Sequence, residues 1–120
     1  MSCRWVDILA HPTGRLILKR EPYRFDTDRV FATAAAAGVA IEINSQVDRL
    51  DLDDVLARSA RDRGVTLVID SDAHSPAALA SVRWGISVAR RAWIQADDVL
   101  NTRPLEAFRA GLRRNKKVKS

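Results

Sequence analysis

Short apolar runs alternate with helix-like segments along this chain, and that alternation constrains its fold more than any other feature. The runs occupy residues 5–10, 39–44 and 65–69 and read WVDILA, VAIEIN and VTLVI. Each has the length and the apolar, β-branched content of a buried strand. Strands separated by helices indicate parallel β/α units, so the predicted fold class is α/β with three such units and C-terminal helices.

The segments between the runs carry helix start and stop signals. Asp26 is expected to cap a helix through Ala37 that Gly38 ends, and Asp51 to cap a second helix through about Arg63. After the third strand we expect a helix over 76–91, broken near Gly85, and short helices over 97–100 and 105–114. The side chains expected on one face of each helix are Val30, Phe31, Ala34 and Ala37 in the first and Leu52, Val55, Leu56 and Ala60 in the second. Trp84 and Trp93 are at positions that fit helix packing.

The length and the composition exclude several classes of protein. A chain of 120 residues, 47% hydrophobic and 29% charged, allows one small globular domain and argues against disorder, collagen and coiled coil. Charges interrupt every apolar stretch before the ~18 residues of a membrane span, and residues 1–10 lack a secretory signal. The single Cys3 excludes an intrachain disulfide and a cysteine-rich zinc module. We therefore expect a cytoplasmic protein without a membrane partner.

The net charge of +5 belongs to one end of the chain. Six of the 20 basic residues lie in the last twelve positions, which hold no acid, so residues 1–108 carry a net charge of −1. A basic end can contact nucleic acid through phosphates, and it can equally be a helix terminus that continues into a solvated tail.

Both histidines of the chain lie just after predicted strands, where β/α proteins gather functional groups. His11 follows the first strand, and Asp72 and His74 follow the third. An Asp-x-His in extended backbone projects both side chains to one side, and imidazole with carboxylate suits zinc, manganese or iron. A hydrogen-bonding role at the surface is the alternative for each histidine. Asp70 is a rival carboxylate, or a strand-terminal residue that caps the next turn.

Three further polar residues are weaker candidates for the site. Glu42 and Asn44 share one face of the second strand, where they can orient metal ligands or bind substrate, or else form a polar pair in solvent. Arg15 lies in a glycine-containing loop and can hold a phosphate through its forked guanidinium, or be solvated. Cys3 and the serines are in no arrangement that indicates a nucleophile.

The motifs together resemble one protein family. The segments DILAHPTGRLIL (7–18), IEIN (41–44), DRLDL (48–52), VIDSDAHS (68–75), WGISVARRAWI (84–94) and DVLNT (98–102) resemble the C-terminal part of the polymerase and histidinol phosphatase (PHP) domain of bacterial family X DNA polymerases. HPTGR with the downstream DAH is the more specific pair. DVLNT after ARRAW points to the polymerase branch rather than to free-standing phosphatases.

The resemblance implies a distorted (β/α)7 barrel whose cluster of zinc or manganese ions cleaves phosphoester bonds. It makes His11, Asp72 and His74 metal ligands, and it supports Glu42 and Asn44 as strand residues near the cleft. In the polymerase branch it implies a 3′-5′ exonuclease or 3′ phosphatase that acts on DNA in repair. One metal ion would activate a water molecule while another stabilises the leaving oxygen.

The chain departs from the family pattern by lacking the His-x-His pair and the other ligands of the barrel, since it has only two histidines. We therefore expect residues 1–114 to be the C-terminal portion of a PHP domain and 115–120 a basic tail, with an incomplete site for Mn²⁺ or Zn²⁺ that is inactive alone. The start at Met1 suggests a truncated or misassigned reading frame, or a remnant of a split gene. A separate chain that carries the missing half of the barrel is an expected partner. The alternative is a non-enzymatic module that binds DNA through the basic tail.

Overall fold

A three-stranded parallel sheet forms the centre of the molecule. The structure, a computed structural model, describes residues 5–115. The strands are β1 (Ile8–Leu9), β2 (Ala40–Asn44) and β3 (Leu67–Asp70), in the order β1-β2-β3. Leu9 pairs with Ile41, and Asn44 pairs with Asp70. The predicted α/β class and its three parallel units are therefore confirmed, whereas closure into a partial barrel stays a proposal.

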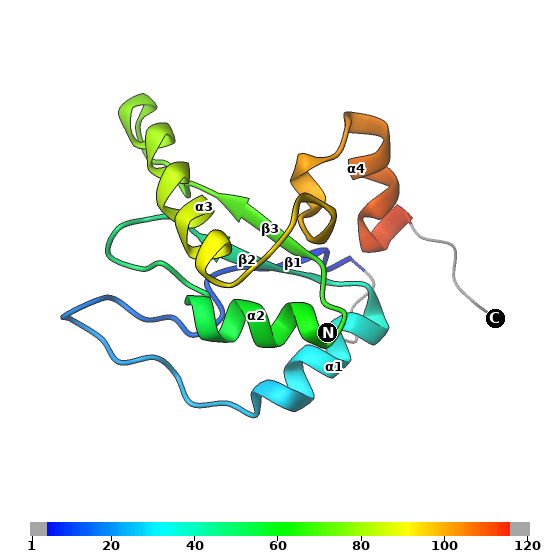
Figure 1. Ribbon diagram of the computed structural model, residues 1–120, viewed down its shortest axis with the longest axis horizontal. Coiled ribbons are helices and arrows are strands. Elements are labelled where there is room, and N and C mark those ends of the chain that lie inside the picture. The colour runs from blue at the N-terminus through cyan, green and yellow to red at the C-terminus, as the bar shows by residue number, and fades with distance from the viewer. Residues whose placement is uncertain (1–4, 116–120) are drawn as a thin grey trace.

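Within residues 5–115, four α-helices lie around this sheet, as can be followed in Figure 1. They are α1 (Thr27–Ala37), α2 (Asp54–Asp62), α3 (Val82–Arg91) and α4 (Leu105–Gly111), and 3-10 turns η1 to η4 cover Pro76–Ser81, Ala96–Asp98, Leu100–Thr102 and Arg113–Asn115. None of the helices within residues 5–115 is long and apolar enough to cross a membrane.

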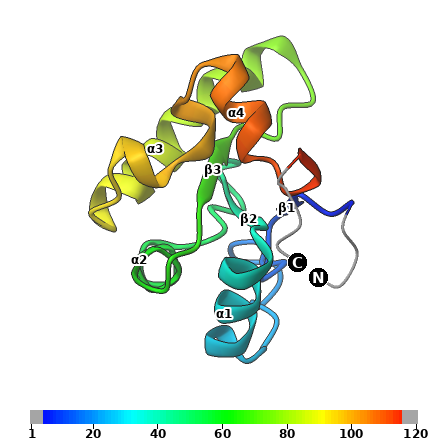
Figure 2. The same ribbon diagram turned by 90° about the vertical axis from the view of Figure 1, so that its right-hand side faces the viewer.

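The two faces of the sheet are covered differently, as Figure 2 shows. Ile41 and Ile43 of β2 and Leu67 of β3 pack into the main core with side chains of α1, α2 and α3. The alternate residues Ala40 and Val68 face the other way and form a smaller core; Leu100, Phe108 and Leu112 of the C-terminal segment complete it. The polar residues Glu42, Asn44 and Asp70 alternate in the same way, so they lie on the same face as Ala40 and Val68. They are nearer the C-terminal ends of the strands than this small core.

The first predicted helix is correct at both ends. The Asp26 side chain accepts a hydrogen bond from the Arg29 amide at 3.1 Å. Gly38 ends the helix in the left-handed conformation at φ 72°. Phe31 and Ala34 are fully buried, as expected from their spacing.

The second predicted helix starts later than expected. Asp53 caps it, with its carboxylate 2.8 Å from the Leu56 amide, whereas Asp51 is fully buried and binds another loop. Val55 is 72% exposed, because this later start turns it away from the core. Leu52 is buried as predicted, but it precedes the helix.

The third predicted helix is divided, but not at Gly85. The 3-10 turn η1 passes into α3 between Ser81 and Val82, and Gly85 lies inside α3. Trp84 and Trp93 fit helix-packing positions in the sequence, but they are 41% and 69% exposed, so neither packs in the core. Arg83 lies over the Trp84 ring and Arg58 over the Trp93 ring, which covers part of each apolar face.

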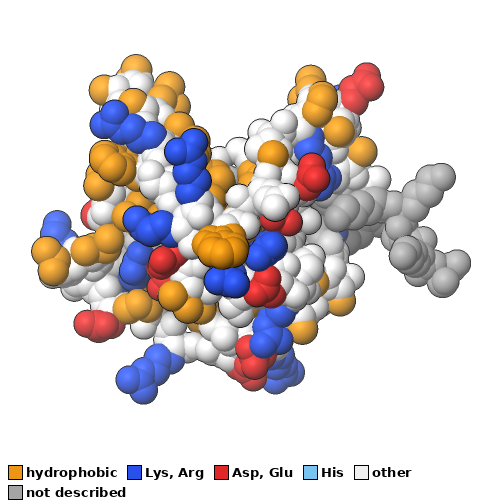
Figure 3. All heavy atoms as spheres, viewed as in Figure 1, with side chains coloured by type: hydrophobic (Ala, Val, Ile, Leu, Met, Phe, Trp, Pro, Cys, Tyr) orange, Lys and Arg blue, Asp and Glu red, His pale blue; other side chains and the backbone are white. Residues whose placement is uncertain are grey.

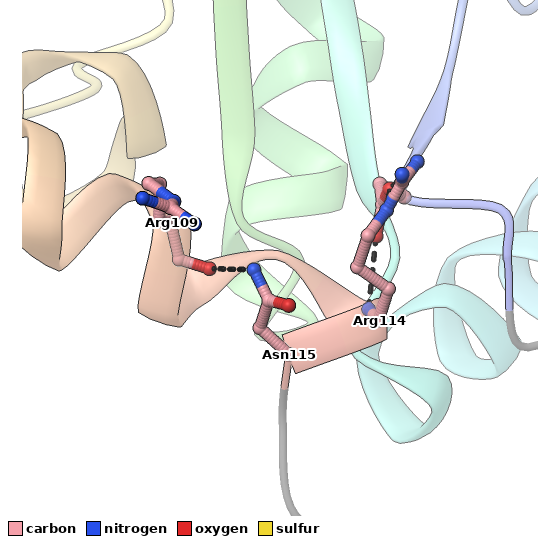
Figure 4. Close-up of polar contacts among 4 residues, drawn as sticks. Arg109, Arg114 and Asn115 are labelled. Carbon is pink, nitrogen blue, oxygen red and sulfur yellow. Dashed lines mark hydrogen bonds and ion pairs between the residues drawn. The ribbon is translucent and has the colours of Figure 1, made fainter.

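Residues far apart in the sequence meet where the C-terminal segment returns to β1. The Arg114 amide donates to an Asp7 carboxylate oxygen at 2.9 Å, and its guanidinium forms an ion pair with the same carboxylate. Figure 4 shows Arg114 in this position, and Asn115 donating to the Arg109 carbonyl at 2.8 Å. The predicted tail, residues 115–120, lies outside the described residues except for Asn115.

Candidate functional site

The C-terminal ends of the three strands place the candidate residues at one edge of the sheet. Because the strands are parallel, their C-terminal ends lie together, and the segments that follow β1, β2 and β3 begin there. His11 comes two residues after β1, Asn44 is the last residue of β2, and Asp72 comes two residues after β3. The topology therefore places the backbone positions of His11, Asn44 and Asp72 at the same edge of the sheet.

The loop that carries His11 is held by two buried carboxylates. The His11 amide donates to Glu42 Oε1 at 2.7 Å. Asp51 accepts the Thr13 and Gly14 amides at 3.0 and 2.9 Å, and its own side chain is fully buried. These bonds fix a tight turn in which His11 has φ 26°, while its imidazole is exposed. Asp51 is thus a positioning residue for the histidine loop rather than the helix cap that the sequence predicted.

Asn44 connects the strand β2 to the Asp-x-His segment. Its side-chain amide donates to Glu42 Oε1 at 3.1 Å and to Asp72 Oδ2 at 3.0 Å. Glu42 is 6% exposed and Asn44 fully buried, so the alternative of a polar pair in solvent is wrong. One amide therefore holds two carboxylates near each other and orients Asp72.

His74 lies against the backbone of its own segment and against Gln46. Its Nδ1 is 2.8 Å from the Asp72 carbonyl oxygen and 3.3 Å from the Gln46 side-chain nitrogen. Gln46 also donates to that carbonyl, at 2.7 Å. In the tautomer that donates from Nδ1 to the carbonyl, the Nε2 lone pair is available for a metal ion. Asp72 itself has φ 48°, in the left-handed region, so the expected extended backbone is wrong.

Asp70 is the most perturbed carboxyl of the site. Burial, then a hydrogen bond to Glu42 and the negative charges of Glu42 and Asp72, raise the pKa of Asp70 to about 8, against a smaller opposing effect of the Asp72 backbone amide. At neutral pH Asp70 is therefore protonated and donates to Glu42. Its Oδ1 is buried without a hydrogen-bond partner among residues 5–115. The hydrogen bond that Asp70 accepts from the Asp72 backbone amide is the contact expected of the predicted turn-capping role.

Arg15 binds backbone carbonyls in the adjoining loop. Its Nε donates to the Arg49 carbonyl at 2.6 Å and its Nη2 to the Leu50 carbonyl at 2.5 Å. These contacts hold the 46–50 loop beside the histidine loop. A phosphate-binding role for Arg15 stays a prediction.

A complete metal centre is not formed by these side chains. Within residues 5–115, no group of three or more His, Cys, Asp or Glu side chains is arranged to hold a metal ion. Asp72 Oδ2 accepts a hydrogen bond from Asn44, and His74 Nδ1 lies on the Asp72 carbonyl oxygen. The described residues thus form no complete cation site.

Sequence reasoning missed two contributors to this site. Asp51 looked like a helix cap because it precedes an apolar helical pattern, and Gln46 carried no signal at all. The one available signal was the run of three acids at 51, 53 and 54, because a helix needs only one of them as its cap. Nothing in the local pattern indicates that Asp51 would instead bind a loop 38 positions earlier.

The chain was also compared with known proteins. Over 115 residues it is 43% identical to the DNA polymerase/3′-5′ exonuclease PolX of Bacillus subtilis (strain 168). Over 106 residues it is 32% identical to a probable phosphatase of Shewanella sp. (strain ANA-3), and over 104 residues 30% identical to one of Thermoanaerobacter sp. (strain X514).

The chain spans only part of each of these relatives. The matches cover 96%, 83% and 82% of this chain, but 20% of the polymerase and 40% of each phosphatase. No protein-family model matches the chain. The similarity to polymerase X agrees with the family resemblance of the motifs, and the phosphatase matches agree with a PHP-type phosphoesterase.

Proposed function

We infer that this chain, a sequence of PHP-type phosphoesterase origin related to the family X DNA polymerases, supplies part of the divalent-metal site of a phosphoesterase that acts on DNA. The similarity to polymerase X over 96% of the chain carries this proposal. In it, residues 1–114 form the C-terminal portion of a PHP domain, and the activity is that of a 3′-5′ exonuclease or phosphatase in DNA repair.

The residues that would hold the cation are His11, Asp72 and His74. Nitrogen and carboxylate ligands suit Mn²⁺ or Zn²⁺, which would supply an activated water molecule and charge stabilisation when bound. Asn44 orients the Asp72 carboxylate, and the Asp72 carbonyl fixes the His74 ring. Because these residues do not form a complete centre, we propose that the chain alone is inactive and that further ligands come from a complementing polypeptide.

The metal content of the purified chain tests this proposal. After loading with Mn²⁺ or Zn²⁺ and desalting, the wild-type chain is expected to retain metal that an Asp72→Asn/His74→Gln variant loses. Asp97→Asn is the matched control, because Asp97 is exposed on η2. Equal metal content in all three chains, or none in a folded wild-type chain, would contradict the proposed ligands. Hydrolysis of a phosphodiester by the chain alone would contradict its proposed inactivity.

A second proposal is a non-enzymatic role in binding DNA through the basic C-terminal end. The exposure of Trp84 and Trp93, each beside an arginine, favours it, since exposed rings can stack on bases. Lys116, Lys117 and Lys119 lie outside the described residues. Deletion of 115–120 keeps the Arg114–Asp7 ion pair, so loss of a steep salt-dependent DNA affinity in that variant would support this role. Unchanged affinity would exclude it.

A further inference from the structure

The loop between β1 and α1 contains a closed, projecting segment, residues 15–24, which we call the 15–24 arm. Figure 1 shows it in blue at the left edge. The Leu16 amide donates to the Arg20 carbonyl at 3.0 Å, and the Arg20 amide to the Leu16 carbonyl at 2.7 Å. Leu18 lies at the turn with φ 66°, and its side chain is fully exposed. Paired backbone groups therefore give the arm a defined shape.

The base of the arm is fixed to the loop that carries His11. The Tyr23 amide donates to the Thr13 carbonyl at 2.6 Å. The Tyr23 ring packs so closely on Gly14 that a Cβ there would lie 2.3 Å from it. The Ile17 amide donates to the Asp48 carbonyl at 2.6 Å, beside the Arg15 contacts already described. The arm is thus a rigid extension of the histidine loop rather than a free connection.

The surface of the arm combines positive charge with apolar and aromatic groups. It contains four basic residues and one acidic residue, a net charge of +3, in a chain whose first 108 residues carry −1. Lys19 and Arg24 are exposed and form no ion pair with any described residue from 5 to 115. Tyr23 is 59% exposed, with the Arg20 guanidinium 5.8 Å from its ring centre. In Figure 3 the same edge shows hydrophobic and Lys/Arg side chains side by side.

The arm also encloses a hollow of about 380 Å³. It is lined by the eight consecutive residues from Arg15 to Pro22, among them Lys19 and Arg20. A concave surface with cations and an adjoining exposed ring matches the two demands of single-stranded nucleic acid, which are neutralisation of phosphates and stacking of bases. An acidic protein partner would use the charges but would have no need of the ring.

We propose that the 15–24 arm binds the backbone of single-stranded DNA. Lys19 and Arg24 contact phosphates, and the Tyr23 ring stacks on a base. Because the arm continues the histidine loop, it would direct the 3′ end of the strand toward His11 and His74. This inference deepens the proposed function and rests on it for the substrate, while the binding itself requires no metal.

Fluorescence anisotropy of a labelled oligothymidine 12-mer with the full chain in EDTA tests the arm. Lys19→Ala/Arg24→Ala is expected to weaken binding roughly tenfold near 0.1 M salt. It should also lower the slope of log affinity against log salt by about 1.4, at about 0.7 per phosphate contact. Arg29→Ala/Arg90→Ala is the matched control, since it removes the same charge from the exposed faces of α1 and α3. Equal affinities of the two double variants would overturn the proposal.

The stacking contact has its own test. Tyr23→Leu is expected to weaken binding several-fold without a change in the salt slope, because a ring and not a charge is lost. Tyr23→Phe should retain the wild-type affinity. Circular dichroism of each variant checks that the fold persists, and a wild-type affinity in folded Tyr23→Leu would overturn the stacking contact. Displacement of the oligonucleotide by polyglutamate at equal charge concentration would show a surface for acidic proteins instead and overturn the inference.

The two proposals fail in different ways. DNA binding is measured in EDTA, so it does not depend on His11, Asp72 or His74 as metal ligands. A chain that retains no metal but loses DNA affinity in Lys19→Ala/Arg24→Ala would overturn the proposed metal site and leave the arm. A chain that retains metal but binds DNA equally well without these two cations would overturn the arm alone.

Discussion

Asn44 shows how one buried side chain organises the candidate site. Its amide nitrogen donates to Glu42 and Asp72, and its Oδ1 accepts the Gln46 amide at 3.0 Å. All of its hydrogen-bonding capacity in this arrangement is therefore used inside the protein. An apolar residue here would remove the donor that lies between the Glu42 and Asp72 carboxylates, at a cost of about 1–3 kcal/mol for each group left unsatisfied.

The proton on Asp70 gives the metal-free chain a pH-dependent stability. The pKa of Asp70 rises from 3.8 to about 8 on folding. Between these values the folded chain holds a proton that the unfolded chain has released, so the free energy of unfolding falls as pH rises from about 4 to 8. The slope is below the limit of about 1.4 kcal/mol per pH unit, because solvent screens this half-buried carboxyl.

We expect Asp70→Asn to remove this contribution, because a neutral amide does not titrate. Urea unfolding in EDTA at pH 5, 6, 7 and 8 measures it: the variant should gain stability relative to the wild type as pH rises. Asp97→Asn should keep the wild-type slope. Parallel pH profiles for the wild type and Asp70→Asn would show that the Asp70 proton does not contribute.

At the scale of the elements, Gly85 determines how closely α3 approaches the sheet. It is buried in α3, and a Cβ at this position would lie 2.0 Å from Ser45 Oγ and 2.9 Å from Ile69 Cγ2. The helix therefore packs directly on the ends of β2 and β3, next to the Asp-x-His segment. Glycine is unfavourable within a helix. It is present at position 85 because a larger residue would collide with Ser45 and Ile69.

Gly85→Ala is expected to lower the free energy of unfolding by about 1 kcal/mol, the middle of the range of about 0–2 kcal/mol that remains when the gain in helix propensity is subtracted from the cost of overpacking. The gain in helix propensity is about 1 kcal/mol, and overpacking of this contact costs about 1–3 kcal/mol, so the steric effect is larger. Thermal unfolding compares it with Ser87→Ala on the exposed face of α3, which should change little. Addition of Ser45→Ala should recover part of the loss, because the nearest atom is then absent. An increase in stability of the single variant would refute the close packing.

At the scale of the whole molecule, one ion pair joins residues 107 positions apart. Asp7 is 9% exposed, and Arg114 reaches it from η4 after the chain has passed through every other element. Phe108 and Leu112, which precede Arg114 in the chain, pack on the small core of Ala40, Val68 and Leu100. The Arg114–Asp7 ion pair therefore fixes the C-terminal segment to the start of β1.

Arg114→Ala is expected to lower the free energy of unfolding by about 2 kcal/mol, because it leaves the buried Asp7 carboxylate without its cation. Arg109→Ala is the control, since the Arg109 side chain is exposed and its backbone carbonyl is retained. In a double-mutant cycle with Asp7→Asn, the loss should be smaller than the sum of the two single losses. Strict additivity of the two substitutions would contradict a direct interaction.

The sequence by itself determined the elements and the positions of the candidate residues. The apolar runs predicted three parallel strands, Asp26 and Gly38 marked both ends of α1, and the two histidines were placed after strands. These are local properties, because caps, turns and side-chain alternation depend on residues a few positions apart.

Only the tertiary structure decided which polar groups meet. Asp51 holds a loop 38 residues earlier, Asn44 reaches Asp72 across 28 residues, and Trp93 is left outside the core. These outcomes depend on the packing of the sheet ends and on the competition of several carboxylates for few donors. The spacing of residues in the sequence does not predict which donors and acceptors pair, because the interacting atoms are distant in the chain and become neighbours only in the folded structure.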